Sequence, residues 1–189
     1  MLDKSQEILL LDIAEASIRH GLDYGRPLSV SPGDYQDSLR APGACFVTLN
    51  RSGQLRGCIG SLSAHRPLVE DVADNAYAAA FSDPRFPPLR EEELEGLDIH
   101  ISILTPAEPM RFDSEADLLR QLQPGVDGLI MEEGFRRGTF LPSVWEQLPS
   151  PDLFLTHLKQ KAGLPTNYWS DTLRVSRYTT ISFGRQANT

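Results

Sequence analysis

The segment around Cys58 combines a reactive sulfur, a positive charge and unusual backbone freedom. Residues 56–60 read Arg-Gly-Cys-Ile-Gly, so the thiol lies between two glycines and two residues after a guanidinium, in a segment with strand-like composition. Glycine weakens a strand, and a pair of glycines predicts a bulge, a bend, or the close approach of another backbone or a ligand. A nearby guanidinium also favours the thiolate, which is the nucleophilic form of cysteine.

Two observations limit this interpretation. Residues two apart on a strand lie roughly 6–7 Å apart, so Arg56 does not contact Cys58 unless the backbone bends. Cysteine is also among the most buried residue types, and Cys58 next to Ile59 is equally typical of a small core residue. The segment is therefore a candidate site with a structural alternative.

A cysteine nucleophile needs a base within hydrogen-bond reach and an acid that orients the base. His65 follows the Cys58 strand on a predicted loop, and His100 lies on the polar face of another predicted strand. Asp83 and Asp98 are possible acids. Because the sequence fixes no distance, both histidines are catalytic candidates beside Cys58, and each is also explained as a solvated or packing side chain.

Residues 82–88, Ser-Asp-Pro-Arg-Phe-Pro-Pro, form a stiff loop that cannot continue a helix, because its prolines remove donors and restrict their neighbours. One interpretation is a packing device in which Phe86 fills a gap. The other is a rigid loop that holds two charged residues at the rim of the Cys58 site. The second interpretation predicts these binding residues: Arg56, Gly57, Gly60, Ser61, Asp83 and Arg85.

Composition restricts the classes of function. The chain has 189 residues, 26 acidic against 18 basic side chains and a net charge of -8, which disfavours binding to nucleic acid. Its two cysteines, Cys45 and Cys58, match no zinc or redox spacing, so we expect no metal site. The longest apolar run near the N-terminus is residues 8–11, too short for a signal peptide or a membrane span. We therefore expect a cytoplasmic protein with reduced thiols and no membrane association.

The order of predicted elements begins with a helix over 5–20, with Gly21 as its C′ residue, and an irregular stretch over 22–43. A hairpin follows, with strands over 45–49 and 54–61 around a turn that contains Gly53. Apolar spacing predicts a helix after Pro67, a short helix is predicted over 91–94, and strict alternation predicts a strand over 99–103.

The second half repeats this order after a helix that begins at Ser114 and closes at Pro124-Gly125. Strands are predicted over 129–131 and 138–141, helices around 144–148 and 150–162, and a strand over 172–183. Residues 45–104 and 129–183 thus share the order strand, strand, helix, helix, strand, which indicates an internal duplication. Residues 137–140, Arg-Gly-Thr-Phe, correspond to residues 56–59, so Thr139 is the inert counterpart of Cys58, and the two second strands are expected near each other in one mixed or curled sheet.

Five segments together resemble the AMMECR family, whose bacterial and archaeal members are called AmmeMemoRadiSam system protein A. They are residues 55–60 (Leu-Arg-Gly-Cys-Ile-Gly), 79–89, 102–106 (Ser-Ile-Leu-Thr-Pro), 140–142 and 161–164. The resemblance implies an α+β fold in which two β3α2 repeats form a single barrel-like, largely antiparallel sheet with flanking helices. It predicts one AMMECR-like domain over 1–189, divided into an N-terminal helix and loop (1–43), a first repeat (44–104), a connector helix (105–126) and a second repeat (127–189).

The resemblance defines neither a reaction nor a cofactor, so both stay unknown. It implies an accessory component that binds a ligand or partner and acts with a Memo-like protein and a radical S-adenosylmethionine enzyme. The alternative from the residues is a cysteine-dependent enzyme with Cys58 as nucleophile. A second alternative, a nucleic-acid or translation-linked factor, is disfavoured by the acidity of the chain.

Overall fold

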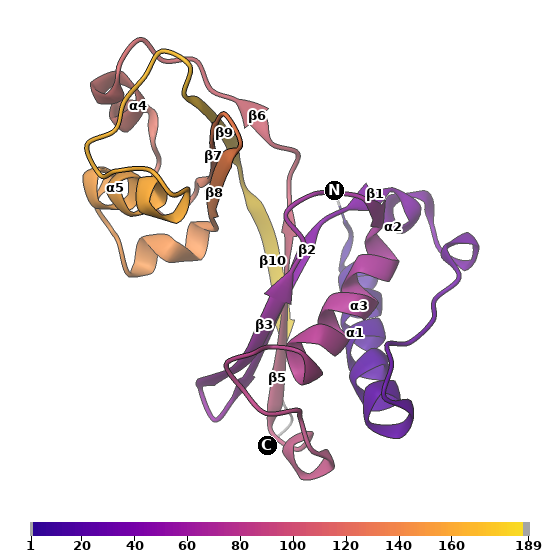
Figure 1. Cartoon of the computed structure of the whole chain (residues 1–189). Helices are drawn as coiled ribbons and strands as arrows, with labels where there is room; N and C mark the ends of the chain where they lie inside the picture. The colour runs from indigo at the N-terminus through magenta and orange to yellow at the C-terminus, as the bar shows by residue number, and fades with distance from the viewer. Residues whose placement is uncertain (1, 187–189) are drawn as a thin grey trace. The chain divides into compact units, whose positions relative to one another are not determined.

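A computed structural model describes residues 2–186 of the chain, and its backbone divides into two compact units. Unit 1 comprises the residues up to Leu104 together with those from Ile181 onward, and unit 2 comprises Thr105–Thr180. Figure 1 shows a sheet and helices in each unit. Among residues 2–186, no helix combines the length and apolar character that a membrane span requires.

Unit 1 is built on a four-stranded sheet with the order β10-β5-β2-β3. The predicted hairpin is confirmed, because β2 and β3 pair antiparallel and are joined at Ser52 and Gly53, which both have positive φ. The alternation of β5 is confirmed as well, with its apolar side chains buried and His100 exposed. The strand bounds are β2 Cys45–Arg51, β3 Gln54–Gly60, β5 Leu97–Leu104 and β10 Thr180–Arg185, and a small separate sheet pairs β1 Pro42–Gly43 with β4 Arg66–Pro67.

Two long helices cover one face of this sheet. Helix α3 packs on β2 and β3, and α1 packs on α3 and β5. The small side chains of α3, among them Ala73, Ala76 and Ala79, are buried, which lets the helix lie close to the strands. The bounds of the helices, with 3-10 turns as η, are α1 Lys4–Tyr24, η1 Pro32–Asp34, α2 Asp37–Arg40, α3 Leu68–Phe81 and η2 Glu91–Glu93.

Helix α1 continues beyond its predicted end. Gly21 is not a C′ residue but lies inside the helix, where an added Cβ would be 2.3 Å from the ring of Phe81. The left-handed cap is Gly25, whose N–H donates to the carbonyl of Gly21. The prediction was wrong because this glycine serves the packing of α1 on α3, which the local sequence does not encode.

Unit 2 has its own four-stranded sheet, with the order β6-β9-β7-β8. Its core includes Trp145 and Phe154, whose rings stack with centroids 3.8 Å apart. Ser150 caps α5 by accepting the N–H of Leu153, as predicted, whereas the helix expected around 144–148 is a 3-10 turn that begins earlier. The bounds are β6 Glu108–Pro109, α4 Glu115–Gln121, β7 Gly128–Glu133, β8 Arg136–Phe140, η3 Pro142–Glu146, α5 Pro151–Lys161 and β9 Arg174–Tyr178.

The α+β class is confirmed, but the single barrel-like sheet is not. Residues 2–186 form three separate sheets, and β3 and β8 lie in different ones. The strand predicted over 172–183 is two strands, β9 in unit 2 and β10 beside β5, separated at Thr179. Within each unit the hairpin and the later strand nevertheless follow one pattern, because β5-β2-β3 and β9-β7-β8 have the same order.

Candidate functional site

Cys58 lies on the face of the unit 1 sheet that is opposite α3. Its neighbour Gly57 faces the helix so closely that an added Cβ would be 2.0 Å from the carbonyl oxygen of Ala79. Successive strand residues point to opposite faces, so the Cys58 side chain points away from α3. Cys58 is half-buried, whereas Cys45 is fully buried and its thiol pKa is raised well above the usual value, mainly by burial.

The partner of the Cys58 thiol is a hydroxyl, not a histidine. Sγ lies 3.2 Å from Oγ1 of Thr48, which is opposite Cys58 on β2. Thr48 is also opposite His100 on β5, so the three residues form a row across three strands. Two strand spacings separate Cys58 from His100, which amounts to about 10 Å. The His100 ring instead lies against β10, where an added Cβ on Gly184 would be 2.3 Å from Nδ1.

Asp83 and Arg85 meet Cys58 through its backbone. The N–H of Cys58 donates to the Asp83 carboxylate at 2.9 Å, and an Arg85 nitrogen donates to the Cys58 carbonyl at 3.4 Å. The same guanidinium pairs with the buried Asp83 at 2.7 Å. Hydrogen bonds from Arg85, and then the N–H of Cys58, hold the pKa of Asp83 well below its usual range despite its burial. The loop thus covers the free edge of β3 with a paired acid and base.

Arg56 is the extra residue of a bulge in β3. Leu49 pairs with Gly57 and Asn50 with Leu55, so Arg56 has no partner across the hairpin. Its guanidinium donates to both carboxylate oxygens of Glu93, at 2.8 and 3.1 Å, and to the carbonyl of Pro87. Both side chains of this ion pair are about nine-tenths buried, and hydrogen bonds from Arg56 lower the pKa of Glu93 to about 2. The bend that the glycines predicted is therefore present, and it turns Arg56 toward η2.

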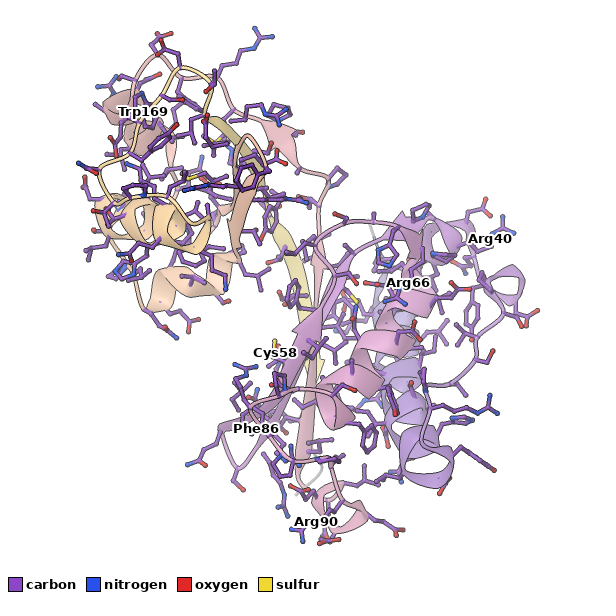
Figure 2. The ribbon with its side chains drawn as sticks, viewed as in Figure 1. Arg40, Cys58, Arg66, Phe86, Arg90 and Trp169 are labelled. Atoms are coloured by element: carbon purple, nitrogen blue, oxygen red, sulfur yellow. The ribbon has the colours of Figure 1, made fainter. Side chains whose placement is uncertain are left out.

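The ring of Phe86 lies close to two guanidinium groups. The Cζ atoms of Arg56 and Arg85 are 5.8 and 5.5 Å from its centroid, within the range of cation–π attraction. Phe86 is half-buried, and Figure 2 shows it on the loop beside the hairpin that carries Cys58. Nη1 of Arg56 is buried without a hydrogen-bond partner among the described residues.

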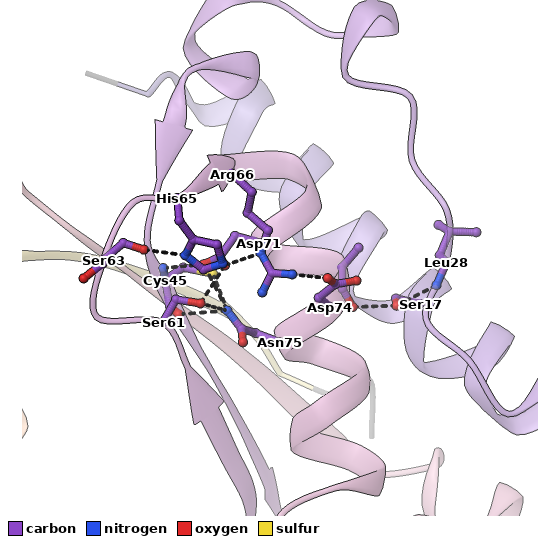
Figure 3. Close-up of polar contacts among 11 residues, drawn as sticks. Ser17, Leu28, Cys45, Ser61, Ser63, His65, Arg66, Asp71, Asp74 and Asn75 are labelled. Atoms are coloured by element: carbon purple, nitrogen blue, oxygen red, sulfur yellow. Dashed lines mark hydrogen bonds and ion pairs between the residues drawn. The ribbon is translucent and has the colours of Figure 1, made fainter.

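Ser61 and Gly60 belong to a different neighbourhood. The hydroxyl of Ser61 donates to Asp71, a fully buried carboxylate in the first turn of α3. Figure 3 shows that Asp71 also accepts from the N–H of Cys45, from Arg66 and from Asn75. This cluster ties the start of β2 and the end of β3 to α3. Gly60 is needed nearby, because an added Cβ would be 2.3 Å from the ring of Phe46.

His65 is exposed on the loop after β3, where Nδ1 lies 2.8 Å from the carbonyl oxygen of Ser63. The structure thus brings Arg56, Asp83 and Arg85 to the Cys58 segment and assigns other neighbours to His65, His100 and Ser61. Residues 2–186 hold no group of three or more His, Cys, Asp or Glu side chains placed to bind a metal ion.

Sequence reasoning missed Thr48 and Glu93. The alternation of β2 and the register of a short hairpin carry a signal for Thr48 as the neighbour of Cys58. Glu93 follows two other glutamates, a run that is typical of a solvated surface, and nothing local distinguishes the buried member.

The fold and the site define the class of this protein: an α+β protein in which a glycine-flanked strand, packed on a helix, is bordered by an Asp-Pro-Arg-Phe loop. The family model described as AMMECR1 matches residues 11–183, and the chain belongs to this family. A protein of Methanothermobacter thermautotrophicus is 38% identical over 94% of this chain and 93% of its own length. One from Thermotoga maritima is 37% identical over 86% of this chain and 89% of its own.

A solved structure has the same fold. The crystal structure of an uncharacterized protein from Pyrococcus horikoshii is similar to this chain with a TM-score of 0.83 and 34% sequence identity, covering 95% of this chain and 91% of that one.

Proposed function

We propose that this protein is a binding component rather than a thiol enzyme. It uses the β3 segment 56–60 and the loop 82–89, here called the Cys58 surface, to hold a ligand or a partner protein. The observation that carries the proposal is the hydrogen bonding of Cys58. Its thiol contacts the hydroxyl of Thr48, and the carboxylate of Asp83 accepts the backbone N–H of Cys58. A threonine hydroxyl is too weak a base to activate a thiol.

The Cys58 surface has the composition of a recognition site. Arg85 is about half exposed and already stacked on the half-buried ring of Phe86, and arginine and aromatic side chains are enriched among binding hot spots. Two ion pairs fix the loop against β3: the buried pair of Arg56 with Glu93, and the pair of the half-exposed Arg85 with the buried Asp83. Fixed side chains lose little conformational freedom on binding, which favours affinity.

The partner that we propose is a Memo-like protein, with a radical S-adenosylmethionine enzyme in the same system. This choice follows from the family resemblance of the motif segments. The Cys58 surface is the part of unit 1 to which we assign that contact.

A chemical block at Cys58 tests the proposal without changing the fold. The purified protein is treated with N-ethylmaleimide, and its binding to a purified Memo-like protein is measured by biolayer interferometry. Cys45 is buried, so the reagent adds its bulk at Cys58. We expect the adduct to weaken binding, whereas a Cys58→Ser variant exposed to the same reagent binds like the untreated protein.

A matched pair of arginine variants tests the loop. Arg85→Ala removes the exposed cation of the Cys58 surface and is expected to weaken binding, whereas Arg40→Ala removes a comparably exposed cation whose partner is Asp37 and leaves binding unchanged. Full binding by both the adduct and Arg85→Ala would contradict the assignment. A Cys58 thiol that alkylates rapidly far below pH 8 would instead favour the enzyme alternative.

A further inference from the structure

Strand β8 of unit 2 occupies the same position as β3 of unit 1. Each is the second strand of a hairpin and an edge of its sheet, and each carries a glycine pressed against a helix. For Gly138 an added Cβ would be 2.6 Å from the backbone nitrogen of Ala162 in the turn after α5, as Gly57 meets Ala79. Thr139 therefore corresponds to Cys58 in backbone position as well as in sequence.

The two edges differ in what covers them. In unit 1, the hydrogen bond from the Ser61 N–H to the Cys45 carbonyl shows which residues of β3 bond to β2. By this alternation the N–H and C=O of Cys58 point away from β2, toward the outside of the sheet. There they are bonded by Asp83 and Arg85. The loop 82–89 therefore blocks the edge of β3, which is how natural sheets prevent unwanted strand pairing.

In unit 2, the corresponding groups have no hydrogen-bond partner among residues 2–186. The N–H of Met110 donates to the carbonyl of Val175, so the N–H and C=O of Val175 point toward β6. Met131 is opposite Val175 on β7, and its N–H and C=O therefore point the other way, toward Gly138 on β8. Thr139 and Arg137, on either side of Gly138, consequently direct N–H and C=O outward. Within residues 2–186, no backbone or side-chain group bonds these outward N–H groups.

The side chains that border this edge are aromatic and charged: Arg137 lies 3.8 Å from the carboxylate of Glu132 on β7, and Arg136 donates to the carbonyl of Gly163. Arg136 and Arg137 are both exposed, and Phe135 at the hairpin turn is 95% exposed with the Arg136 guanidinium 5.8 Å from its ring centroid. Pairing with the same edge of a second copy would bring two arginine pairs together, and like charges on adjacent strands are destabilising. An acidic strand would place its carboxylates beside these arginines.

We propose that β8 is a strand-addition site that binds an extended acidic segment of a partner protein. The segment pairs with the outward backbone groups of Arg137 and Thr139, while its carboxylates lie near the two arginines and its apolar residues contact Phe135. Backbone pairing of this kind supplies affinity, and the side chains supply specificity. This site is in unit 2 and is independent of the Cys58 surface.

The experiment is a titration of the isotope-labelled full chain with two synthetic peptides, alternating Glu-Val and alternating Lys-Val, of equal length. We expect the Glu-Val peptide to shift the amide resonances of Arg137 and Thr139 and to slow their hydrogen exchange, and the Lys-Val peptide to do neither. A Glu-Val peptide that is N-methylated at alternate residues keeps its charge but loses the backbone N–H groups that would pair with β8. We expect it to bind at least about tenfold more weakly than the unmethylated peptide.

A variant pair removes one backbone donor. Thr139→Pro deletes the outward N–H but no ladder bond, and Thr139→Val keeps that N–H while losing the same hydroxyl contacts with Leu129 and Tyr178. We expect the valine variant to bind the Glu-Val peptide and the proline variant not to bind it. If Thr139→Pro does not fold, the N-methylated peptide makes the same test on the unaltered protein.

Three results would overturn the proposal. They are an absence of shifts at Arg137 and Thr139 with millimolar Glu-Val peptide, equal binding of the Lys-Val peptide, and concentration-dependent shifts of these amides without peptide, which would assign the edge to a second copy of the chain.

Discussion

The backbone N–H of Cys58 and the buried carboxylate of Asp83 are joined by a 2.9 Å hydrogen bond across 25 residues of sequence. Asp83 also holds Arg85, whose guanidinium reaches the carbonyl of Cys58. One acid–base pair therefore satisfies both outward backbone groups of a strand residue. The relationship explains how the strand that carries the thiol ends its sheet without an open edge.

Removal of the Asp83 carboxylate leaves the Cys58 N–H without its acceptor and the Arg85 cation without its carboxylate partner. We expect Asp83→Ala to lower the free energy of unfolding by about 2–4 kcal/mol, because an ion pair with one buried member is broken and a backbone donor is left unbonded. Asp83→Asn, whose carbonyl oxygen still accepts, is expected to cost less. Urea unfolding followed by circular dichroism at neutral pH measures both.

The control for the two Asp83 variants is Asp37→Ala, because Asp37 pairs with Arg40 on the surface and its side chain is 92% exposed. We expect a change within about 0.5 kcal/mol for it. An Asp83→Ala protein as stable as the Asp37→Ala protein would show that the edge contact contributes nothing.

Stability is expected to fall on acidification through two carboxylates, Asp83 in the Cys58 surface and Glu93 beside it in η2. Hydrogen bonds from Arg56 lower the pKa of Glu93 from 4.5 to about 2, and those from Arg85 lower that of Asp83. A folded-state pKa below the unfolded value means that the contribution is complete above the unfolded pKa, here about 4.5, and is lost as the pH falls toward about 2.

Urea midpoints measured from about pH 6 down to about pH 2.5 test this dependence. We expect Glu93→Gln to be less stable than the natural chain at the upper end and to lose less stability over the range. An equally steep decline in the variant would refute the assignment of this pH dependence to Glu93.

Two glycines allow close packing of a helix or its final turn on a strand. A methyl group at Gly57 would meet the Ala79 carbonyl at 2.0 Å, and one at Gly138 would meet the Ala162 nitrogen at 2.6 Å. We expect Gly57→Ala and Gly138→Ala each to destabilise the protein by about 1–3 kcal/mol, since backbone atoms cannot yield as side chains do.

Gly33→Ala is the matched substitution, because nothing lies within 4 Å of the position where its Cβ would be. Its melting temperature is expected to equal or exceed that of the natural chain. Melting temperatures from scanning calorimetry that were equal for all three variants would rule out the close-approach explanation.

The two thiols are expected to differ in accessibility. Cys45 is fully buried, whereas Cys58 is half-buried on the face away from α3. A maleimide probe under native conditions should add to one cysteine, located at Cys58 by peptide mass spectrometry, and to both in urea. Native labelling at Cys45, or none at either position, would disagree with this orientation of β3.

The hairpin, the strand over 99–103 and the helix after Pro67 were predictable from sequence, because each follows from a local period or turn residue. The same is true of the α5 cap at Ser150. The segment 172–183 shows the limit of such reasoning. Its composition favours a strand throughout, but β9 and β10 belong to different sheets. Composition does not determine which strand another strand pairs with.

The candidate site divides in the same way. The sequence by itself determined that Cys58 lies on a glycine-flanked strand and that a stiff Asp-Pro-Arg-Phe loop exists, because residue types restrict φ and ψ locally. Only the tertiary structure decided that Asp83 bonds the Cys58 backbone, that Thr48 rather than a histidine contacts the thiol, and that Arg56 turns to Glu93. These pairings join residues 10 to 37 positions apart, and they depend on strand register and on which surfaces exclude water together.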